Sequence, residues 1–311
     1  MAYTNTDTNM TTSSALSAGM QTYYNRELLR TFEPNLVHLQ FGDEHRMPPH
    51  SGLVMNMRKL IPLETNTKAL SEGDPGESVM LAETEVTVQL QQYGEYARCT
   101  DKLDLTHLDM DIMRRTKLFG DAGARSIDAV VREELAKCAN VIYAGGKASR
   151  AELTAADKLT SRELRKAVKT LKKNHAQTFG GYFVAIIGLD TMYDLQEDEA
   201  FVKVSQYQDK ENIYTGEVGR LFGVRLVETT EAKIFEGAGA SGADVASVIV
   251  LGQYAYGVTS LKGAKPRVIV KPAGSAGTAD PLDQISTVGW KMDGFGAKLD
   301  AGYCENHILV I

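Results

Sequence analysis

One stretch of this 311-residue chain carries a helical pattern far longer than the rest. Between residues 109 and 146, apolar side chains recur at the three- and four-residue spacing of one helix face. Asp109 and Asp111 suit the N-terminal end, because the helix dipole favours negative charge there, and Gly145-Gly146 favours a stop. A helix of about 30 residues extends about 45 Å. The chain must therefore fold around a long rod, which is unusual for a compact globular domain.

Two alternating segments predict an extended hairpin. A polar connection rich in glycine, proline and aspartate separates residues 53–63 from residues 86–100. The apolar faces of the two segments consist of Leu53, Met55 and Met57 on the first and Val86, Val88 and Leu90 on the second. Two strands alone bury too little surface to be stable in water. We therefore expect this weakly apolar face to lie across a neighbouring molecule.

The first 50 residues predict an arm rather than a domain. Residues 1–20 are rich in threonine, serine and asparagine, and we expect them to be disordered in the free chain. Residues 20–32 have apolar side chains at helical spacing, and Pro34 disfavours helix at Glu33. An arm this poor in regular pattern is expected to lie on another part of the assembly.

The remaining segments mix helix and strand without a regular β-α-β alternation, which predicts the α+β class. Residues 160–176 predict a helix with Ser161 as N-cap and with Leu164, Val168, Leu171 and His175 facing inward. Further strands are expected at 182–188, 223–229, 247–251 and 266–272, with a short helix after the first of them.

Composition excludes several classes of protein. The formal net charge is −6, with acidic and basic residues interspersed, unlike a dedicated nucleic-acid binder. The N-terminal segment lacks the pattern of a signal peptide, and no apolar run is long enough to cross a bilayer. The three cysteines are widely separated, so we expect neither a metal site nor a disulfide framework.

One glycine motif has the spacing of a dinucleotide-binding fingerprint: Gly237, Gly239 and Gly242. That fingerprint requires a helix directly after the glycines, because the pyrophosphate binds the free N–H groups of the helix N-terminus. The residues that follow, 243–252, are instead rich in β-branched side chains, which favours a strand. We therefore favour a small-residue loop between two strands, with nucleotide binding as the alternative.

Two other clusters have an ordinary and a functional interpretation. Asp104, His107, Asp109 and Asp111 contain ligand types for a divalent ion, but the acids are explained by their place at a helix start. The histidines His38, His45 and His50 lack metal-ligand spacing. A basic stripe at 162–173 is expected to be a solvated helix face rather than a phosphate-binding one.

The order of these parts resembles a known family. The passages that carry the resemblance are 21–42, 92–106, 216–229 followed by 248–257, and the terminal stretch 288–311. They resemble tailed-phage major capsid proteins of the Hong-Kong-97-type fold, and most closely the family of short-tailed phages related to coliphage N-four. The resemblance spans nearly the whole chain.

The resemblance implies a division of the chain. Residues 1–50 would be the N-terminal arm and 51–92 the extended E-loop hairpin. Residues 93–160 and 263–311 would form the peripheral domain, with its spine helix at 109–144. Residues 161–262 would form the axial domain, which meets its copies at the centre of hexamers and pentamers.

The resemblance also implies contacts between subunits. The E-loop residues expected there are Met55, Met57, Lys68, Glu72, Asp74, Val86 and Val88. Those of the N-terminal arm are Tyr23, Tyr24, Leu28 and Phe32. Gly237, Gly239 and Gly242 would lie in an axial loop. The acidic tip of the hairpin predicts an electropositive patch on its partner.

The implied function is structural. The chain would self-assemble, as hexamers and pentamers, into an icosahedral shell around phage double-stranded DNA, without catalysis, cofactor or membrane. It would be located in the virion after assembly in the host bacterial cytoplasm. Its other partners would be a portal protein, scaffolding or decoration proteins, and the packaged DNA through non-specific contacts. The alternatives are an encapsulin-like bacterial compartment and a nucleotide-dependent enzyme that uses residues 237–242.

Overall fold

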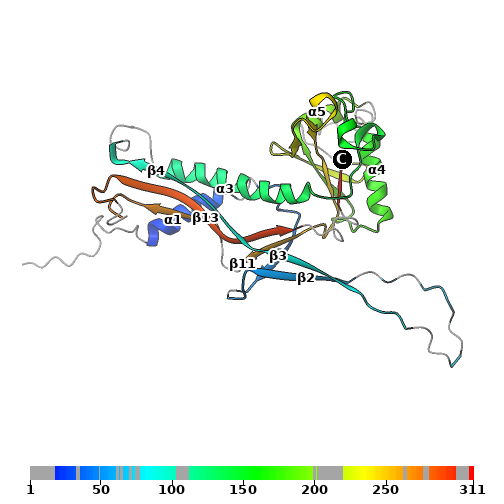
Figure 1. Ribbon diagram of the computed structural model, residues 1–311, viewed down its shortest axis with the longest axis horizontal. Helices are drawn as coiled ribbons and strands as arrows, with labels where there is room; N and C mark the ends of the chain where they lie inside the picture. Colours follow the sequence, from blue (N-terminus) through cyan, green and yellow to red (C-terminus); the bar gives the residue numbers. More distant parts are fainter. Residues whose placement is uncertain are drawn as a thin grey trace, which may run out of the picture.

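The chain has an elongated shape, with a long sheet, a compact unit at one end and a projecting hairpin (Figure 1). The computed structural model describes residues 18–32, 36–48, 50–60, 63, 66–69, 72–73, 78–102, 112–198, 201, 220–261, 265–275, 280–298 and 308–311.

Helices and strands alternate irregularly along the chain, as expected for the α+β class. The helices are α1 (Ala18–Phe32), α3 (Ile112–Leu135), α4 (Ser161–Lys173) and α5 (Leu189–Gln196), with single 3-10 turns at Ala144–Gly146, Arg150–Glu152 and Ala240–Gly242. The strands are β1 (Asp43–Met47), β2 (Val54–Leu60), β3 (Glu83–Gln89), β4 (Gln91–Thr100), β5 (Phe183–Gly188), β6 (Arg220–Leu221), β7 (Val224–Thr229), β8 (Ile234–Phe235), β9 (Val245–Ala246), β10 (Ile249–Leu251), β11 (Gly257–Leu261), β12 (Arg267–Lys271), β13 (Ile285–Lys298) and β14 (Ile308–Val310).

The long sheet is organised around β13. Its strand order is β1-β11-β13-β12, and β4 also pairs with β13. Alternate side chains of β13, among them Val288, Trp290 and Met292, are buried. Trp290 and Met292 belong to one apolar core with Ile127 and Val131 of α3. The long helix therefore covers one face of this sheet (Figure 1).

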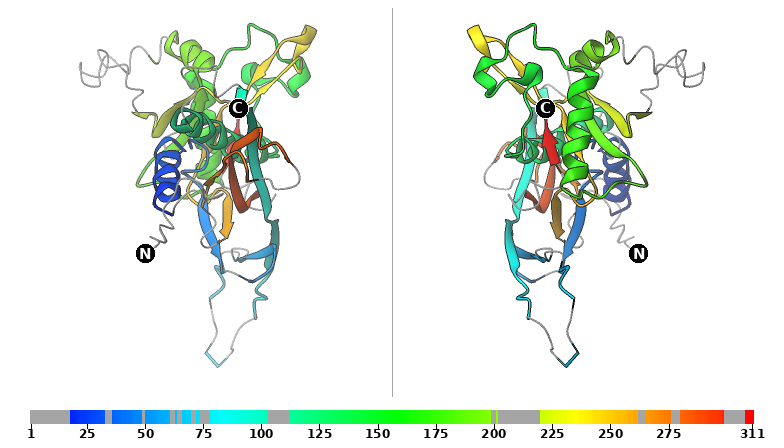
Figure 2. Two further views of the ribbon diagram at one scale, coloured as in Figure 1. Left: turned by 90° about the vertical axis from the view of Figure 1, so that its left-hand side faces the viewer. Right: turned by 90° about the vertical axis from the view of Figure 1, so that its right-hand side faces the viewer.

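The compact unit has its own sheet and core. Its strand order is β14-β10-β5-β7-β6, and β5 pairs in parallel with β7. Helices α4 and α5 cover this sheet (Figure 2). Leu164 and Leu171 of α4 are fully buried in one apolar core with Ile187 and Met192. The inward positions predicted for Leu164, Val168 and Leu171 are confirmed.

The hairpin has the predicted pairing. Strands β2 and β3 are antiparallel, with Met55 opposite Val88 and Met57 opposite Val86. Val86 and Val88 are buried and Met55 packs against them, whereas most other described side chains of the hairpin are exposed. The face that the alternation predicts therefore exists, but it is covered only at the base.

The long helix is shorter than its sequence pattern predicts. It ends at Leu135 instead of continuing to Gly145-Gly146, and residues 103–111 lie outside the described part of the chain. Residues 138–142 instead meet the C-terminal strand: Ile142 N–H donates to the Val310 carbonyl and Asn140 Nδ2 donates to the Ile308 carbonyl. Pairing with a strand 168 residues away outweighs the local helical preference.

Two expectations for α4 are wrong. Its N-cap is Thr160, which has extended backbone angles, because Ser161 already lies inside the helix. His175 does not face the core: the helix ends at Lys173, and His175 is exposed with a left-handed φ of 57°. A periodic pattern continues past a helix end only while the backbone remains helical.

Other expectations concern the arm and the cysteines. Residues 18–20, expected to be disordered, begin helix α1, and residues 1–17 lie outside the described part. Cys99 is a buried free thiol, but Cys138 is disulfide-bonded, so the expectation of no disulfide is wrong there. Among the described helices, none has the length and hydropathy needed to cross a bilayer.

Candidate assembly surfaces

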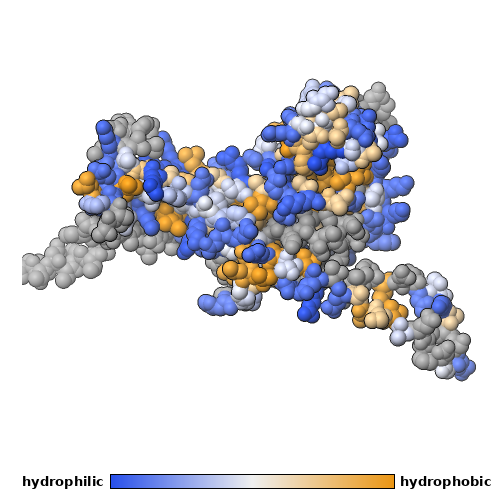
Figure 3. Space-filling model, in the orientation of Figure 1, coloured by the Kyte–Doolittle hydropathy of each residue, from blue (hydrophilic) through white to orange (hydrophobic). Residues whose placement is uncertain are grey.

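The projecting hairpin exposes apolar side chains far from any core. Val79, Met80 and Leu81 precede β3, and the Met80 side chain is 90% exposed. In Figure 3, apolar surface lies along the projecting part of the molecule. Large exposed apolar groups on an extended segment are typical of a contact with another chain.

The hairpin residues expected to contact a neighbour differ in accessibility. Val86 and Val88 are buried within their own chain, and Met55 is half-buried beside them. Lys68 and Glu72 are exposed. The side chain of Met57 and the whole of Asp74 lie outside the described residues. The contact role of all these residues stays a prediction, and Val79, Met80 and Leu81, which the sequence analysis missed, offer the larger free surface.

The face of the long sheet opposite α3 is open. A cleft of about 650 Å³ lies over β4, β12 and β13. Tyr96 and Arg98 of β4 pair with Gly289 and Thr287 of β13, so their side chains share this face. Lys271 and Ile269 of β12 also line the cleft. Arg98, Lys271 and Lys291 line the cleft against Glu95 and Asp280, so it combines a small excess of positive charge with apolar surface.

The N-terminal helix packs on its own subunit. Leu28 is fully buried in the core that contains α3. Tyr24 is half-buried and Tyr23 is 41% exposed, with their rings in edge contact at 6.0 Å. The side chain of Phe32 lies outside the described residues. The arm contacts expected for Tyr23, Tyr24 and Leu28 stay predictions, although the Leu28 side chain is covered within its own subunit.

A buried polar cluster fastens the segment after α1 to the long helix. Asp128 of α3 accepts hydrogen bonds from the backbone N–H groups of His38 and Leu39, at 2.7 and 3.3 Å. His38 Nδ1 lies 2.5 Å from Asp128 Oδ2, and both side chains are almost wholly buried. The Tyr256 hydroxyl donates to the His38 carbonyl. We call residues 36–42 the strap, because this cluster ties them to α3 and to the β10–β11 connection.

Burial shapes the chemistry of this cluster. Desolvation, and then the nearby Asp128 carboxylate, raises the pKa of Tyr256 well above its ordinary value, so the hydroxyl stays protonated and donates. The sequence analysis missed this cluster. His38 has no ligand spacing with other histidines, and its partner is 90 residues away.

The glycine motif forms a closed loop rather than a nucleotide cradle. It joins β8 to β9, with Gly237 and Gly242 at positive φ angles of 60° and 76°. The Gly237 N–H donates to Asp244 Oδ1, and the Ala240 N–H donates to the Leu153 carbonyl. A side chain at Gly239 would approach the Leu153 and Ala243 carbonyls to 2.9 Å. The loop is followed by strands β9 and β10, as predicted, and not by a helix. The glycine motif therefore lacks the helix N-terminus that a dinucleotide-binding fingerprint requires.

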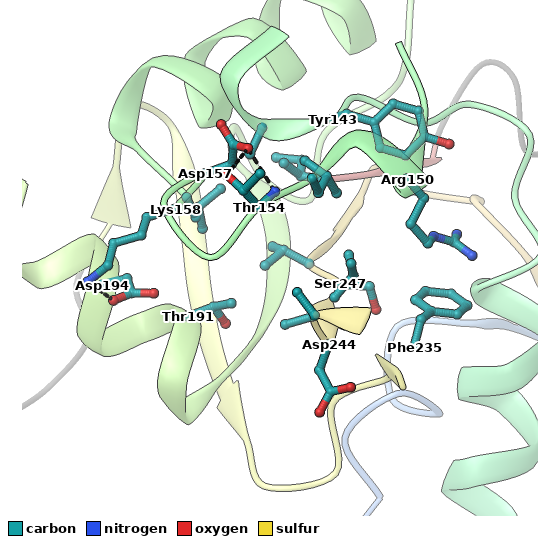
Figure 4. A pocket seen from close by; sticks show the side chains of 18 of the residues that line it. Tyr143, Arg150, Thr154, Asp157, Lys158, Thr191, Asp194, Phe235, Asp244 and Ser247 are labelled. Carbon is teal, nitrogen blue, oxygen red and sulfur yellow. Dashed lines mark hydrogen bonds and ion pairs between the residues drawn. The ribbon is translucent and has the colours of Figure 1, made fainter. Parts of the chain in front are cut away.

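A small pocket of about 180 Å³ lies beside this loop (Figure 4). Lys158 Nζ pairs with Asp194 at 2.7 Å, and this carboxylate, with Glu197, raises the pKa of Lys158. Hydrogen bonds from Thr154 lower the pKa of Asp157. The Arg150 guanidinium lies 3.5 Å from the centre of the Phe235 ring. Lys158, Asp157 and Arg150 therefore each have a partner within the pocket, and among the described residues no cluster suitable for a metal occurs.

Comparison with known proteins identifies the family. A family model described as phage capsid protein matches residues 83–303, more than two thirds of the chain. The chain belongs to the phage capsid protein family. A comparison with curated protein sequences finds no significant match.

Solved capsid structures share the fold of this capsid protein. The capsid of cyanophage Pam1 matches with a TM-score of 0.67 at 15% identity, over 100% of this chain and 97% of that one. The capsid of Ralstonia phage GP4 also gives 0.67, at 14% identity over 96% and 93%. That of cyanophage P-SCSP1u gives 0.67, at 13% identity over 88% and 87%. The Hong-Kong-97-type fold predicted from the sequence is confirmed.

The family and the fold together decide the main function. The chain is a phage major capsid protein, a structural protein that assembles with copies of itself into the shell of the virion. The encapsulin-like alternative is not favoured, because the matching family model is that of phage capsids.

Helix α4 of the capsid protein carries the predicted basic stripe. Its cations are exposed and lie opposite the buried Leu164, Val168 and Leu171. The exposure expected of a solvated helix face is thus confirmed.

Proposed function

We propose that this capsid protein forms hexamers and pentamers of an icosahedral shell that encloses phage double-stranded DNA, and that the hairpin β2–β3 is the main link between neighbouring subunits. The observation that carries this proposal is the exposed apolar segment Val79, Met80 and Leu81 on a hairpin that has almost no core of its own. A closed ring repeats each such contact, so individually weak contacts suffice for a stable shell.

The open face of the long sheet is the proposed acceptor for a neighbour's hairpin. Arg98 and Lys271 supply positive charge, and Ile269 and Tyr96 supply apolar surface. The connection between β2 and β3 carries Glu64, Glu72, Asp74 and Glu77 against Lys68, so its net charge is opposite to that of the cleft. Opposite charge favours the correct docking orientation, and apolar burial supplies affinity.

The other parts follow from this arrangement. Residues 1–50 serve as the N-terminal arm and 51–92 as the E-loop. The peripheral domain, expected at 93–160 and 263–311, corresponds to the long sheet with α3, and the axial domain, expected at 161–262, to the compact unit with the glycine loop near the ring centre. Two strands cross these expected boundaries: β11 (Gly257–Leu261) belongs to the long sheet, and β14 (Ile308–Val310) belongs to the compact unit's sheet. Assembly takes place in the host bacterial cytoplasm with a portal protein, scaffolding or decoration proteins, and DNA as further partners. Genomic neighbours that encode a portal and a terminase would support this over a bacterial compartment.

A deletion tests the hairpin. Removal of residues 64–81, with the strands rejoined by Asn-Gly, removes the acidic tip together with Val79, Met80 and Leu81 and leaves both cores in place. We expect unchanged circular dichroism and cooperative melting, but no closed shells by electron microscopy. Unfolding of the deleted protein would make the hairpin part of the core, and normal shells would refute its role as the link.

A charge reversal tests the acceptor. Arg98→Glu combined with Lys271→Glu should prevent shell formation while the subunit stays folded. The matched control is Lys147→Glu with Arg225→Glu, which reverses two exposed cations of the compact unit. If the control variant fails to form shells while the Arg98→Glu, Lys271→Glu variant still forms them, the acceptor for the hairpin lies elsewhere.

A further inference from the structure

Helix α4 concentrates positive charge on one exposed face. Its 13 residues include six cations, all exposed: Arg162, Arg165, Lys166, Lys169, Lys172 and Lys173. Glu163 is the acid in this helix, and its carboxylate accepts a hydrogen bond from the Thr160 hydroxyl. The whole chain has a net charge of −6, so this face is opposite in sign to the molecule that carries it.

Some exposed cations of the chain form ion pairs within the subunit. Lys158 and Arg267, for example, do so at 2.7 and 3.2 Å. Within the part of the chain that the structure describes, none of the α4 cations forms an ion pair. Arg165 stacks instead over the Phe222 ring, with its guanidinium carbon 5.0 Å from the ring centre. Ion pairs with the described residues of its own subunit therefore do not neutralise the stripe.

The helix holds these charges in a fixed array. Leu164, Ala167 and Leu171 are fully buried, which anchors the opposite side of α4 to the compact unit. Like charges three or four residues apart on a helix repel one another and destabilise it. A polyanion bound to the stripe would remove this repulsion, whereas solvent and salt only screen it.

The basic face of α4 also lies on the outside of the molecule. Helix α4 lies at the end of the compact unit away from the long sheet (Figures 1 and 2). The side of α4 that carries the cations is exposed. The corresponding edge is hydrophilic in Figure 3. The cations span about 16 Å along the helix, a length of B-DNA that carries about ten phosphates.

We propose that the exposed face of α4 binds the phosphate backbone of duplex DNA, and that it is therefore a contact between the capsid protein and its packaged contents. This inference rests on the proposed function, in which the shell encloses DNA. Lysine and arginine side chains contact phosphates without distinguishing base sequence, so the binding is sequence-independent. It revises the interpretation of this stripe as a merely solvated face, because the described structure leaves its charge uncompensated.

Salt dependence measures the contact directly. The unassembled protein is titrated into a fluorescent 30-base-pair duplex at several sodium chloride concentrations. Each neutralised phosphate contributes about −0.9 to the slope of log K against log salt. Arg165→Gln, Lys169→Gln and Lys173→Gln together should reduce the steepness of this slope by about 2 to 3 and weaken binding at low salt by at least about tenfold. Glutamine keeps a high helix propensity, so circular dichroism should not change.

A matched variant controls for net charge. Arg26→Gln, Arg30→Gln and Lys117→Gln also remove three exposed cations, but from α1 and α3. We expect this control to keep a slope close to that of the unmodified protein. Equal slopes for all three proteins, or a larger loss in the control, would overturn the proposal.

Electron microscopy separates this inference from the proposed function. Both variants should still build closed shells. If the α4 variant binds the duplex normally but fails to assemble, the stripe contacts an acidic surface of a second copy, and the DNA proposal is wrong. If shells form normally and duplex binding is unchanged, the proposal also fails while the proposed function stands.

Discussion

The compact unit and the hairpin bury their apolar residues to very different extents. In the compact unit, Leu164, Leu171 and Ile187 are fully buried in a core enclosed by its own sheet and helices. The hairpin has a cluster of two buried valines, Val86 and Val88, with Met55 packed against them. Beyond this base, its apolar side chains are exposed.

This difference separates two kinds of stability. A closed core makes the compact unit stable within one subunit, because burial of apolar surface supplies the main favourable free energy of folding. The hairpin gains little from folding alone, so its apolar side chains contribute mainly when a second copy covers them. Substitutions in the two regions should consequently alter different measurements.

The largest predicted effect breaks the core of the compact unit. Leu171→Ala should lower the free energy of unfolding of the unassembled subunit by about 2–5 kcal/mol, because it leaves a cavity at a fully buried position. Met80→Ser, at a 90% exposed position, should change it by less than about 0.5 kcal/mol. Urea unfolding followed by circular dichroism measures both values.

Assembly should respond in the opposite order. Met80→Ser should reduce the yield of closed shells at a subunit concentration where the unmodified protein assembles fully. Val88→Ala is an informative intermediate, because this buried residue lies at the hairpin base and should affect unfolding as well as assembly. If Met80→Ser destabilised the free subunit as much as Leu171→Ala, the contrast between the two regions would be wrong.

A smaller effect is expected at the strap. Asp128→Asn keeps an oxygen that can accept from the backbone N–H groups of His38 and Leu39, but it removes the charge that faces the imidazole. The free energy of unfolding should fall by about 1–3 kcal/mol, the usual range for a disturbed buried polar group. Asp101→Asn, at an exposed position, is the control.

Limited proteolysis shows where that loss is located. Release of the strap should speed trypsin cleavage after Arg30, since α1 is connected to the strap, while cleavage inside the compact unit stays slow. Uniform acceleration across the chain would instead indicate that the strap is part of a single cooperative core.

The sequence predicts local features of this molecule well and distant pairings poorly. The alternation of Met55 and Met57 against Val86 and Val88 gives the correct hairpin register, because opposed apolar residues must share one face. The inward face of α4 follows from its helical spacing in the same way. Both predictions depend only on residues that are close in sequence or joined by one turn.

The failures share a different cause. The end of α3 at Leu135 depends on pairing of residues 141–142 with β14, and the burial of Leu28 depends on α3. The Asp128 cluster likewise joins three distant segments. No periodicity records which distant segment becomes a neighbour. The helical spacing of Leu28 likewise does not distinguish a surface inside the subunit from a surface between subunits.

The smallest predicted effect sharpens the comparison at the junction between the long helix and the compact unit. Lys233 Nζ, beside β8, lies 2.8 Å from both carboxylate oxygens of Glu133 on α3. Burial by itself would raise the pKa of Glu133, but hydrogen bonds from Lys233 and Arg132 outweigh it and lower the pKa. The Glu133 side chain is 44% exposed, so solvent screens the pair and its contribution should stay below about 1 kcal/mol.

The sign of the pH dependence follows from that lowered pKa. The folded state binds a proton on Glu133 less readily than the unfolded state, whose pKa is near 4.5. The stabilising contribution is therefore fully present above pH 4.5 and is lost as the pH falls through the lower folded-state value. Glu133→Gln should destabilise the subunit slightly at pH 7, and the difference from the unmodified protein should disappear at acidic pH. Lys233→Met should give the same convergence, since it removes the other half of the pair. A difference that persists unchanged into acid would show that the junction depends on packing rather than on this ion pair, and the compact unit would then be less independent of the long sheet than its closed core indicates.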